Sequence, residues 1–271
     1  MDEKLNPREK ELEALLEEAG GSPAARPEFY RKLLESELYV LGEGAHNGLH
    51  VVGEPHSVSV ASFGFEDGLK TPVFSSLEKL QLFLTRMGLT EAQHFIRMSA
   101  RTLFESINKN PLMLNPGSDV AKELTLAEIE SLLDGSIFSK VEKVTVPEQT
   151  SVFYGQPAEY PEPLVAQLVK YFEKQETVNA AYLALMIVPN MENPMSYVIG
   201  IDHHGNFDTI ANDISLIAGE VLEKGKSLTF EDLSDPTERN AGEGYLKTTE
   251  PFYRREKKGL LGALATWFGK K

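Results

Sequence analysis

Short apolar runs alternate with amphipathic segments along the chain, and this alternation restricts the fold more than any other feature of the sequence. Leu38–Leu41 and Val178–Val188 are apolar runs of the kind found in buried strands. The segment from Thr125 to Asp134 instead repeats its large apolar residues at helical spacing. Strands and helices in alternation are typical of α/β domains, in which helices cover a sheet.

Two pairs of predicted strands follow each other directly, without a helix between them. Ser57–Phe63 alternates polar and apolar residues, residues 66–68 supply Glu-Asp-Gly turn chemistry, and Leu69–Phe74 continues as a second strand. Val178–Val188 and Met195–Asp202 form a similar pair. Strands joined in this way are antiparallel. We therefore expect two consecutive α/β domains with mixed sheets and interspersed hairpins, not a purely parallel doubly wound sheet.

Capping residues mark the ends of several predicted helices. Asn6-Pro7 begins a helix that ends at Gly20-Gly21. A later helix runs from about Asp208 to Lys224, and Gly225 is expected to cap its C-terminal end. The Gly-Lys-Ser sequence at 225–227 therefore closes a helix, whereas a phosphate-binding loop must open one.

Composition shifts divide the chain into three parts. Residues 1–138 hold the first domain, residues 139–256 the second, and residues 257–271 form a basic amphipathic tail. The connection at 140–149 contains Pro147 and few large apolar residues, as expected of a linker.

The charge and cysteine content exclude several classes of protein. With no cysteine, the chain has neither disulfides nor a thiolate zinc site. Charged residues occupy the N-terminal segment where a signal peptide needs an apolar core, and the longest apolar run, Ala180–Val188, is half of the ~20 residues of a membrane-spanning helix. We therefore expect a cytoplasmic protein. The net charge of −14 argues against a nucleic acid partner, because an acidic body repels phosphates.

The tail carries the only concentration of basic residues. Leu260, Leu261, Leu264, Trp267 and Phe268 would share one face of a helix, with lysines at both ends. Such a segment can dock on its own domain, enter the groove of a partner or lie weakly on an acidic membrane surface.

The best metal-like cluster is Asp202, His203, His204 and Asp208, because imidazole and carboxylate groups bind divalent ions. Neighbouring residues of an extended strand point to opposite faces, so both histidines can bind one ion only if the backbone turns between them. A turn at Gly205-Asn206 before a helix explains the same residues without a metal.

A second candidate site is the turn after the predicted strand 111–114. Asn115, Gly117 and Ser118 would present amide and hydroxyl groups beside a helix start, where small anions or amino-acid carboxylates bind. The alternative is a tight turn closed by an Asx-type hydrogen bond.

Several turn and core segments, none of them a catalytic signature, occur in a characteristic order. They are Thr71–Leu80, Leu114–Ser118 and Leu124–Leu133 in the first domain, and Tyr154–Pro161, Val178–Leu183, Tyr197–Asp202 and Pro251–Arg255 in the second. On these segments the chain resembles the bacterial SseB family, named for enhanced serine sensitivity, over nearly its whole length. The resemblance implies a cytoplasmic protein linked to the response of growth to serine, and it supplies no catalytic residues.

Together these features favour a binding or regulatory protein over an enzyme, with no cofactor. The expected partner is another protein or a small metabolite. The candidate binding residues are Asn115, Gly117, Ser118, Tyr253, Arg254 and Trp267. Two alternatives remain: a metal-dependent or anion-binding enzyme centred on Asp202, His203 and His204, and a peripheral membrane adaptor that uses residues 257–271.

Overall fold

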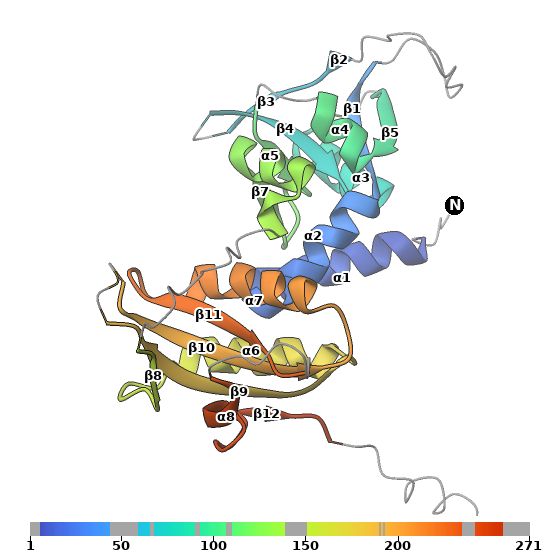
Figure 1. Ribbon diagram of the computed structural model, residues 1–271. Coiled ribbons are helices and arrows are strands. Elements are labelled where there is room, and N and C mark those ends of the chain that lie inside the picture. Colours follow the sequence, from blue (N-terminus) through green and yellow to red (C-terminus); the bar gives the residue numbers. More distant parts are fainter. Residues whose placement is uncertain are drawn as a thin grey trace, which may run out of the picture. The chain divides into compact units, whose positions relative to one another are not determined.

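The chain forms two compact units, residues 1–140 and 141–271, as defined by their internal contacts in a computed structural model (Figure 1). The structure describes residues 6–43, 59–65, 68–89, 93–106, 110–138, 151–189, 191, 193–234 and 242–256. The predicted tail 257–271 and the whole of the predicted linker 140–149 lie outside these residues. None of the helices in the described ranges combines the length and apolarity needed to cross a bilayer.

Unit 1 is built on a mixed sheet. Its strands are β1 (Glu37–Glu43), β2 (Ser59–Val60), β3 (Phe63–Phe65), β4 (Gly68–Phe74), β5 (Phe95–Ser99), β6 (Leu112–Leu114) and β7 (Lys122–Leu124). The main order is β5-β1-β4-β6-β7, with β2 added to β1 and β3 to β4. Among the described strands of unit 1, only β4 and β6 pair in parallel. A hairpin of β3 and β4 forms around the predicted turn, whose residues Glu66 and Asp67 lie outside the described residues. The predicted first strand, Ser57–Phe63, is wrong, because residues 59–60 pair with β1 as β2 and the strand that pairs with β4 begins only at Phe63.

Unit 1 has five helices among its described residues, two of which lie close to the helices predicted at Asn6–Gly21 and Thr125–Asp134. They are α1 (Pro7–Gly21), α2 (Arg26–Glu35), α3 (Leu77–Arg86), α4 (Ala100–Ser106) and α5 (Leu126–Asp134), with 3₁₀ turns at Pro23–Ala25 and Ser136–Phe138. The cap at Asn6 is confirmed: its side chain accepts from the Arg8 amide, and the Glu9 carboxylate accepts from the Asn6 amide. Gly135 ends α5 with φ 80°, a left-handed conformation that favours glycine.

Both faces of β1 are buried, which accounts for its continuous apolar run. Tyr39 and Leu41 pack with Phe74 of β4 and Phe83 of α3, whose rings lie 5.4 Å apart. Leu38 and Val40 are also fully buried and point to the opposite face, as alternation along a strand requires.

Unit 2 has a second mixed sheet, and this confirms the predicted fold class. Its strands are β8 (Phe153–Gly155), β9 (Val178–Ile187), β10 (Met195–His203), β11 (Ser227–Asp232) and β12 (Tyr253–Arg254), and its helices are α6 (Glu162–Lys174), α7 (Phe207–Val221) and α8 (Glu243–Leu246). The order is β11-β10-β9, with β8 and β12 both paired to β9. β10 and β11 are parallel and α7 connects them, whereas β9 and β10 form the predicted antiparallel pair.

A close approach shapes one face of this sheet. Leu233 and Leu246 pack on Ala184 and Val198. A Cβ atom at Gly200 would lie 2.8 Å from a methyl carbon of each of these two leucines. Glycine at this position therefore lets α8 and the end of β11 sit directly on the backbone of β10.

The predicted end of α7 is wrong. The helix ends at Val221, the amide of Leu222 donates to the carbonyl of Ala218, and Gly225 lies beyond the helix with φ 89°. Glycine is needed there for a turn between α7 and β11, not as the cap of the helix. Sequence reasoning also missed β7 and β12, which are only three and two residues long.

Side-chain hydrogen bonds hold the short strand β12 against the end of α6. The Tyr253 hydroxyl donates to the carbonyl of Phe172 at 2.9 Å. The Arg255 guanidinium donates to the carbonyls of Phe172, Gln175 and Val178. The carbonyls of Phe172 and Gln175 also accept from backbone amides, so Tyr253 and Arg255 add further donors to carbonyls that can accept more than one bond.

Candidate functional site

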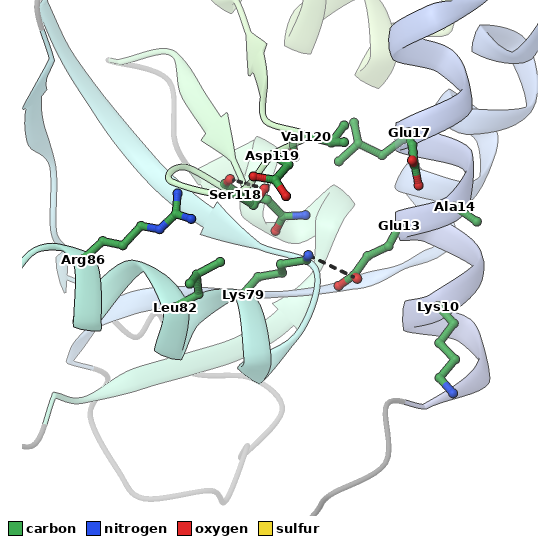
Figure 2. A pocket seen from close by; sticks show the side chains of 12 residues that line it. Lys10, Glu13, Ala14, Glu17, Lys79, Leu82, Arg86, Ser118, Asp119 and Val120 are labelled. Atoms are coloured by element: carbon green, nitrogen blue, oxygen red, sulfur yellow. Dashed lines mark hydrogen bonds and ion pairs between the residues drawn. The ribbon is translucent and has the colours of Figure 1, made fainter.

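A groove of about 410 Å³ opens in unit 1 between α1, α3 and the loop after β6 (Figure 2). Charged residues around it include Lys10 and Glu17 of α1, Lys79 and Arg86 of α3, and Asp119 of the loop. Residues three to four apart share one helix face. Each helix therefore presents one face to the groove, with Ala14 between the charges of α1 and Leu82 between those of α3.

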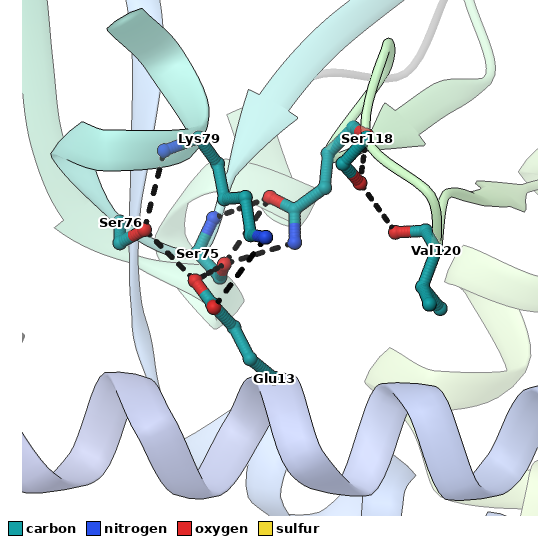
Figure 3. A network of polar contacts seen from close by, with 7 residues as sticks. Glu13, Ser75, Ser76, Lys79, Ser118 and Val120 are labelled. Atoms are coloured by element: carbon teal, nitrogen blue, oxygen red, sulfur yellow. Dashed lines mark hydrogen bonds and ion pairs between the residues drawn. The ribbon is translucent and has the colours of Figure 1, made fainter. Parts of the chain in front are cut away.

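Polar side chains at one end of the groove form a closed network (Figure 3). Glu13 Oε1 accepts from the hydroxyls of Ser75 at 2.7 Å and Ser76 at 2.8 Å, and its Oε2 lies 3.7 Å from Lys79 Nζ. Asn115 Oδ1 accepts from the Ser75 amide at 2.9 Å. The network joins α1, the start of α3 and the end of β6, which are distant in the sequence.

The proton of Ser75 can be assigned from the contacts. A hydroxyl has one proton to donate, and the shortest contact of Ser75 Oγ is with Glu13. The Asn115 amide nitrogen lies 2.9 Å from the same Oγ and donates to it. The Ser75 hydroxyl thus donates one hydrogen bond and accepts another within the protein, and Ser75 is fully buried.

The predicted turn at 115–118 forms one wall of the groove. Asn115 has φ 52° and Gly117 has φ 77°, so two left-handed residues reverse the chain. The Ser118 amide donates to the Asn115 carbonyl at 3.2 Å, and the Ser118 Oγ lies 2.8 Å from the same carbonyl and 2.7 Å from that of Val120. The Asn115 side chain does not close an Asx turn, because it is buried and bonded to Ser75. An Arg86 guanidinium N–H donates to the carbonyl of Gly117.

Glu13→Ala tests the network. The substitution leaves the hydroxyls of Ser75 and Ser76 without their acceptor, and we expect unit 1 to lose about 2 kcal/mol of stability. Hydrogen exchange of β4, followed by mass spectrometry, measures the loss. Glu17→Ala, an exposed position one turn later on the same helix, is the matched control and should change little. Equal effects of the two substitutions would contradict a special role for Glu13.

The sequence identified one wall of this groove but not the others. Asn115 and Ser118 line it, as does Asp119. Glu13, Lys79 and Arg86 were missed, because each reads as part of an ordinary amphipathic helix. The three-to-four-residue spacing of Lys79, Leu82 and Arg86 was an available signal, but it equally describes a solvated helix face.

The predicted metal-like cluster does not converge. His203 is buried and its Nε2 lies 3.2 Å from Asp232, whereas His204 and Asp208 are exposed. Asp202 accepts from the Asn179 side chain at 3.1 Å. No group of three His, Asp or Glu side chains in the described part of the chain is arranged to hold an ion.

The remaining predicted residues lie outside the groove lining. Tyr253 is buried in β12, with its hydroxyl on the Phe172 carbonyl, and Arg254 is exposed beside it. Gly117 is exposed at the tip of the turn, with its carbonyl bound to Arg86. Trp267 lies outside the described residues.

Unit 2 contains a buried carboxyl group that sequence reasoning missed. Glu231 Oε1 accepts from the Tyr154 hydroxyl at 2.9 Å, and Tyr154 stacks on Tyr245. Burial raises the pKa of Glu231 above its ordinary value, an effect that the hydrogen bond from Tyr154 partly offsets. A Cβ atom at Gly242 would lie 2.4 Å from Glu231 Oε1, so a residue with a side chain would not fit against the carboxylate here.

The raised pKa of Glu231 predicts how the stability of unit 2 depends on pH. The unfolded chain has the lower pKa, so the contribution of this group is full below about pH 4 and is lost as the pH rises through the folded-state pKa. Glutamine does not ionise, so Glu231→Gln should remove this pH-dependent loss. Relative to the unsubstituted protein, the variant should therefore gain more stability in unit 2 at neutral pH than at pH 4. Urea unfolding of both proteins across this range measures the difference, with the exposed Glu223→Gln as control. An unchanged pH profile would contradict the assignment.

Comparison with known proteins gives matches for both units. The family model of the SseB protein N-terminal domain matches residues 12–131, and that of the SseB protein C-terminal domain matches residues 146–255. The chain is 30% identical over 262 residues to Protein SseB of Escherichia coli (strain K12), covering 95% of this chain and 96% of that protein. Protein SseB of Shigella flexneri matches with the same identity and coverage. No solved structure matches the chain.

Proposed function

The chain belongs to the SseB family, and from this premise we propose that it is a non-enzymatic cytoplasmic protein that binds a small metabolite in the groove of unit 1. A volume of about 410 Å³ is at the small end of the range of ligand pockets, which supports a small molecule over a polymer. The family's link to serine sensitivity fits a protein that responds to a metabolite and passes the signal on through a protein partner.

One observation carries the proposal: the hydroxyl groups beside the groove are committed as donors to the protein itself. Ser75 and Ser76 are 0% and 1% exposed and donate to Glu13, so neither can reach a substrate. The Ser118 hydroxyl lies on the carbonyls of Asn115 and Val120, and a carbonyl cannot remove its proton. The described residues that line the groove include no histidine. A nucleophile paired with a base, which acyl transfer requires, is therefore not assembled here.

Equilibrium dialysis tests the proposal. The full chain is dialysed against an equimolar mixture of small metabolites that includes L-serine, and the compounds on both sides are quantified by mass spectrometry. We expect at least one compound to be enriched with the protein and recovered chemically unchanged. A compound that is consumed with turnover, or no enrichment of any compound, would overturn the proposal.

A substitution that fills the groove makes this experiment specific. Ala14 is exposed on α1 and lines the groove, so Ala14→Trp should abolish the enrichment while leaving the fold intact. Ala166→Trp places the same side chain on an exposed position of α6 in unit 2 and should leave the enrichment unchanged. Loss of binding in both variants would mean that the retained compound does not occupy the groove.

A further inference from the structure

The groove of unit 1 has a charge pattern that specifies its ligand more closely. Three cationic side chains, Lys10, Lys79 and Arg86, line it together with three carboxylates, Glu13, Glu17 and Asp119. The formal charges of the residues that line the groove therefore cancel, although the whole chain has a net charge of −14. A ligand of matching chemistry carries charges of both signs.

One of these carboxylates is not available to a ligand. Glu13 accepts from the hydroxyls of Ser75 and Ser76 and lies near Lys79, and its side chain is only 20% exposed. Glu17 and Asp119, by contrast, are both exposed. These two acids are therefore the groups that can meet a positive charge.

Two of the cations, Lys79 and Arg86, lie on a different wall from the available acids, whereas Lys10 lies on α1 with Glu17. Figure 2 shows Lys79, Leu82 and Arg86 along α3, whereas Asp119 lies on the loop and Glu17 on α1. The cationic wall suits a carboxylate, and the opposite edge suits an ammonium group. Leu82, Ala14 and Val120 supply apolar surface between them, enough for a small side chain.

Arg86 is prepared to bind a carboxylate. One guanidinium N–H donates to the Gly117 carbonyl, which fixes the end of an otherwise exposed side chain. A guanidinium has five N–H donors, so four remain, and its planar fork matches the two oxygens of a carboxylate. Holding the side chain in place before binding lowers the entropy that the complex must lose.

From this arrangement we infer that the groove binds a small zwitterion of the α-amino acid type, with its carboxylate on Arg86 and Lys79 and its ammonium group on Asp119 and Glu17. The inference rests on the proposed function and adds the class of ligand. It also assigns an orientation, because the charged residues that α3 contributes to the lining, Lys79 and Arg86, are both cations.

Calorimetric titration of the full chain with three probes tests the ligand class. L-Alanine carries both charges, propionate lacks the ammonium group and ethylamine lacks the carboxylate. We expect L-alanine to bind at least about tenfold more tightly than either of the others, since each of the other probes lacks one set of charge-assisted hydrogen bonds. Propionate or ethylamine binding as tightly as L-alanine would overturn the inference.

Two exposed positions test the orientation separately. Arg86→Gln should weaken L-alanine binding about tenfold or more and leave ethylamine binding unchanged, whereas Asp119→Asn should weaken L-alanine binding and spare propionate. Arg86→Lys keeps the charge without the fork and should restore part of the affinity. Arg101→Gln, an exposed arginine of α4, is the matched control. Equal losses for all three probes in either variant would overturn the orientation.

The result also separates this inference from the proposed function. If dialysis enriches a metabolite that Ala14→Trp excludes, but that metabolite carries only one kind of charge, the zwitterion inference fails and the binding function stands. If no metabolite is enriched, both fail.

Discussion

Asn115→Ala should destabilise unit 1 by about 4 kcal/mol, the largest effect that we expect from a single substitution in this unit. The Asn115 side chain is 1% exposed, accepts from the Ser75 amide and donates to the Ser75 hydroxyl. Its loss leaves a buried backbone N–H unpaired, which costs about 1–3 kcal/mol. The residue also has φ 52°, a conformation that asparagine tolerates and alanine does not.

Hydrogen exchange measures this effect where it occurs. Protection of the β4 amides should fall by about a thousandfold, since each 1.4 kcal/mol corresponds to a factor of ten, while β10 in unit 2 is unaffected. Asn110→Ala is the matched control, because the Asn110 side chain makes one hydrogen bond, to Ser62, near the surface. A loss of similar size in the control, or full protection of β4 in Asn115→Ala, would contradict the structural role of Asn115.

Gly200→Ala should destabilise unit 2 by about 3 kcal/mol through overpacking. The added Cβ would lie 2.8 Å from side-chain carbons of Leu233 and Leu246, which are 5% and 0% exposed and have no free space to move into. The outcome is displacement of α8 from the sheet. Urea unfolding followed by circular dichroism measures the loss.

The matched control lies in the same sheet. Gly155 of β8 has no heavy atom within 4 Å of its would-be Cβ, so Gly155→Ala should be neutral or slightly stabilising. If Gly200→Ala also proved neutral, α8 would not sit on β10 as closely as described.

The alternation of strands and helices was predictable because it is a local property of the sequence. The runs at Leu38–Leu41 and Val178–Val188 became β1 and β9, both of them central strands. β7 and β12 were missed because, unlike the apolar run that became β6, their few residues mix charged and apolar side chains and have no periodicity, and their pairing partners are set by the fold. The end of α7 was misplaced because a glycine after an apolar helical pattern predicts a helix cap as readily as a turn beyond the helix, and Gly225 lies in such a turn.

The groove could be predicted only in part, for a related reason. The turn at Asn115–Ser118 carries its own chemistry in consecutive residues and was identified. Asn115 bonds to Ser75, which is 40 residues away in the chain, and Ser75 bonds to Glu13, which is 62 residues away. No local sequence pattern predicts which helix will pack against this turn. His203 shows the same limit, because its contact with Asp232 depends on the parallel pairing of β10 and β11.

The hydrogen bonds that hold β12 against the end of α6 imply an order in which the two units fold during synthesis. Everything that unit 1 needs has left the ribosome once residue 138 has emerged, and domains generally fold as units from the N-terminal end. Unit 2 is complete only when residues 253–255 have emerged, because β12 pairs with β9 and the Arg255 guanidinium donates to the carbonyls of Phe172, Gln175 and Val178. During translation of the second half, the nascent chain therefore carries a finished first unit and an incomplete second one.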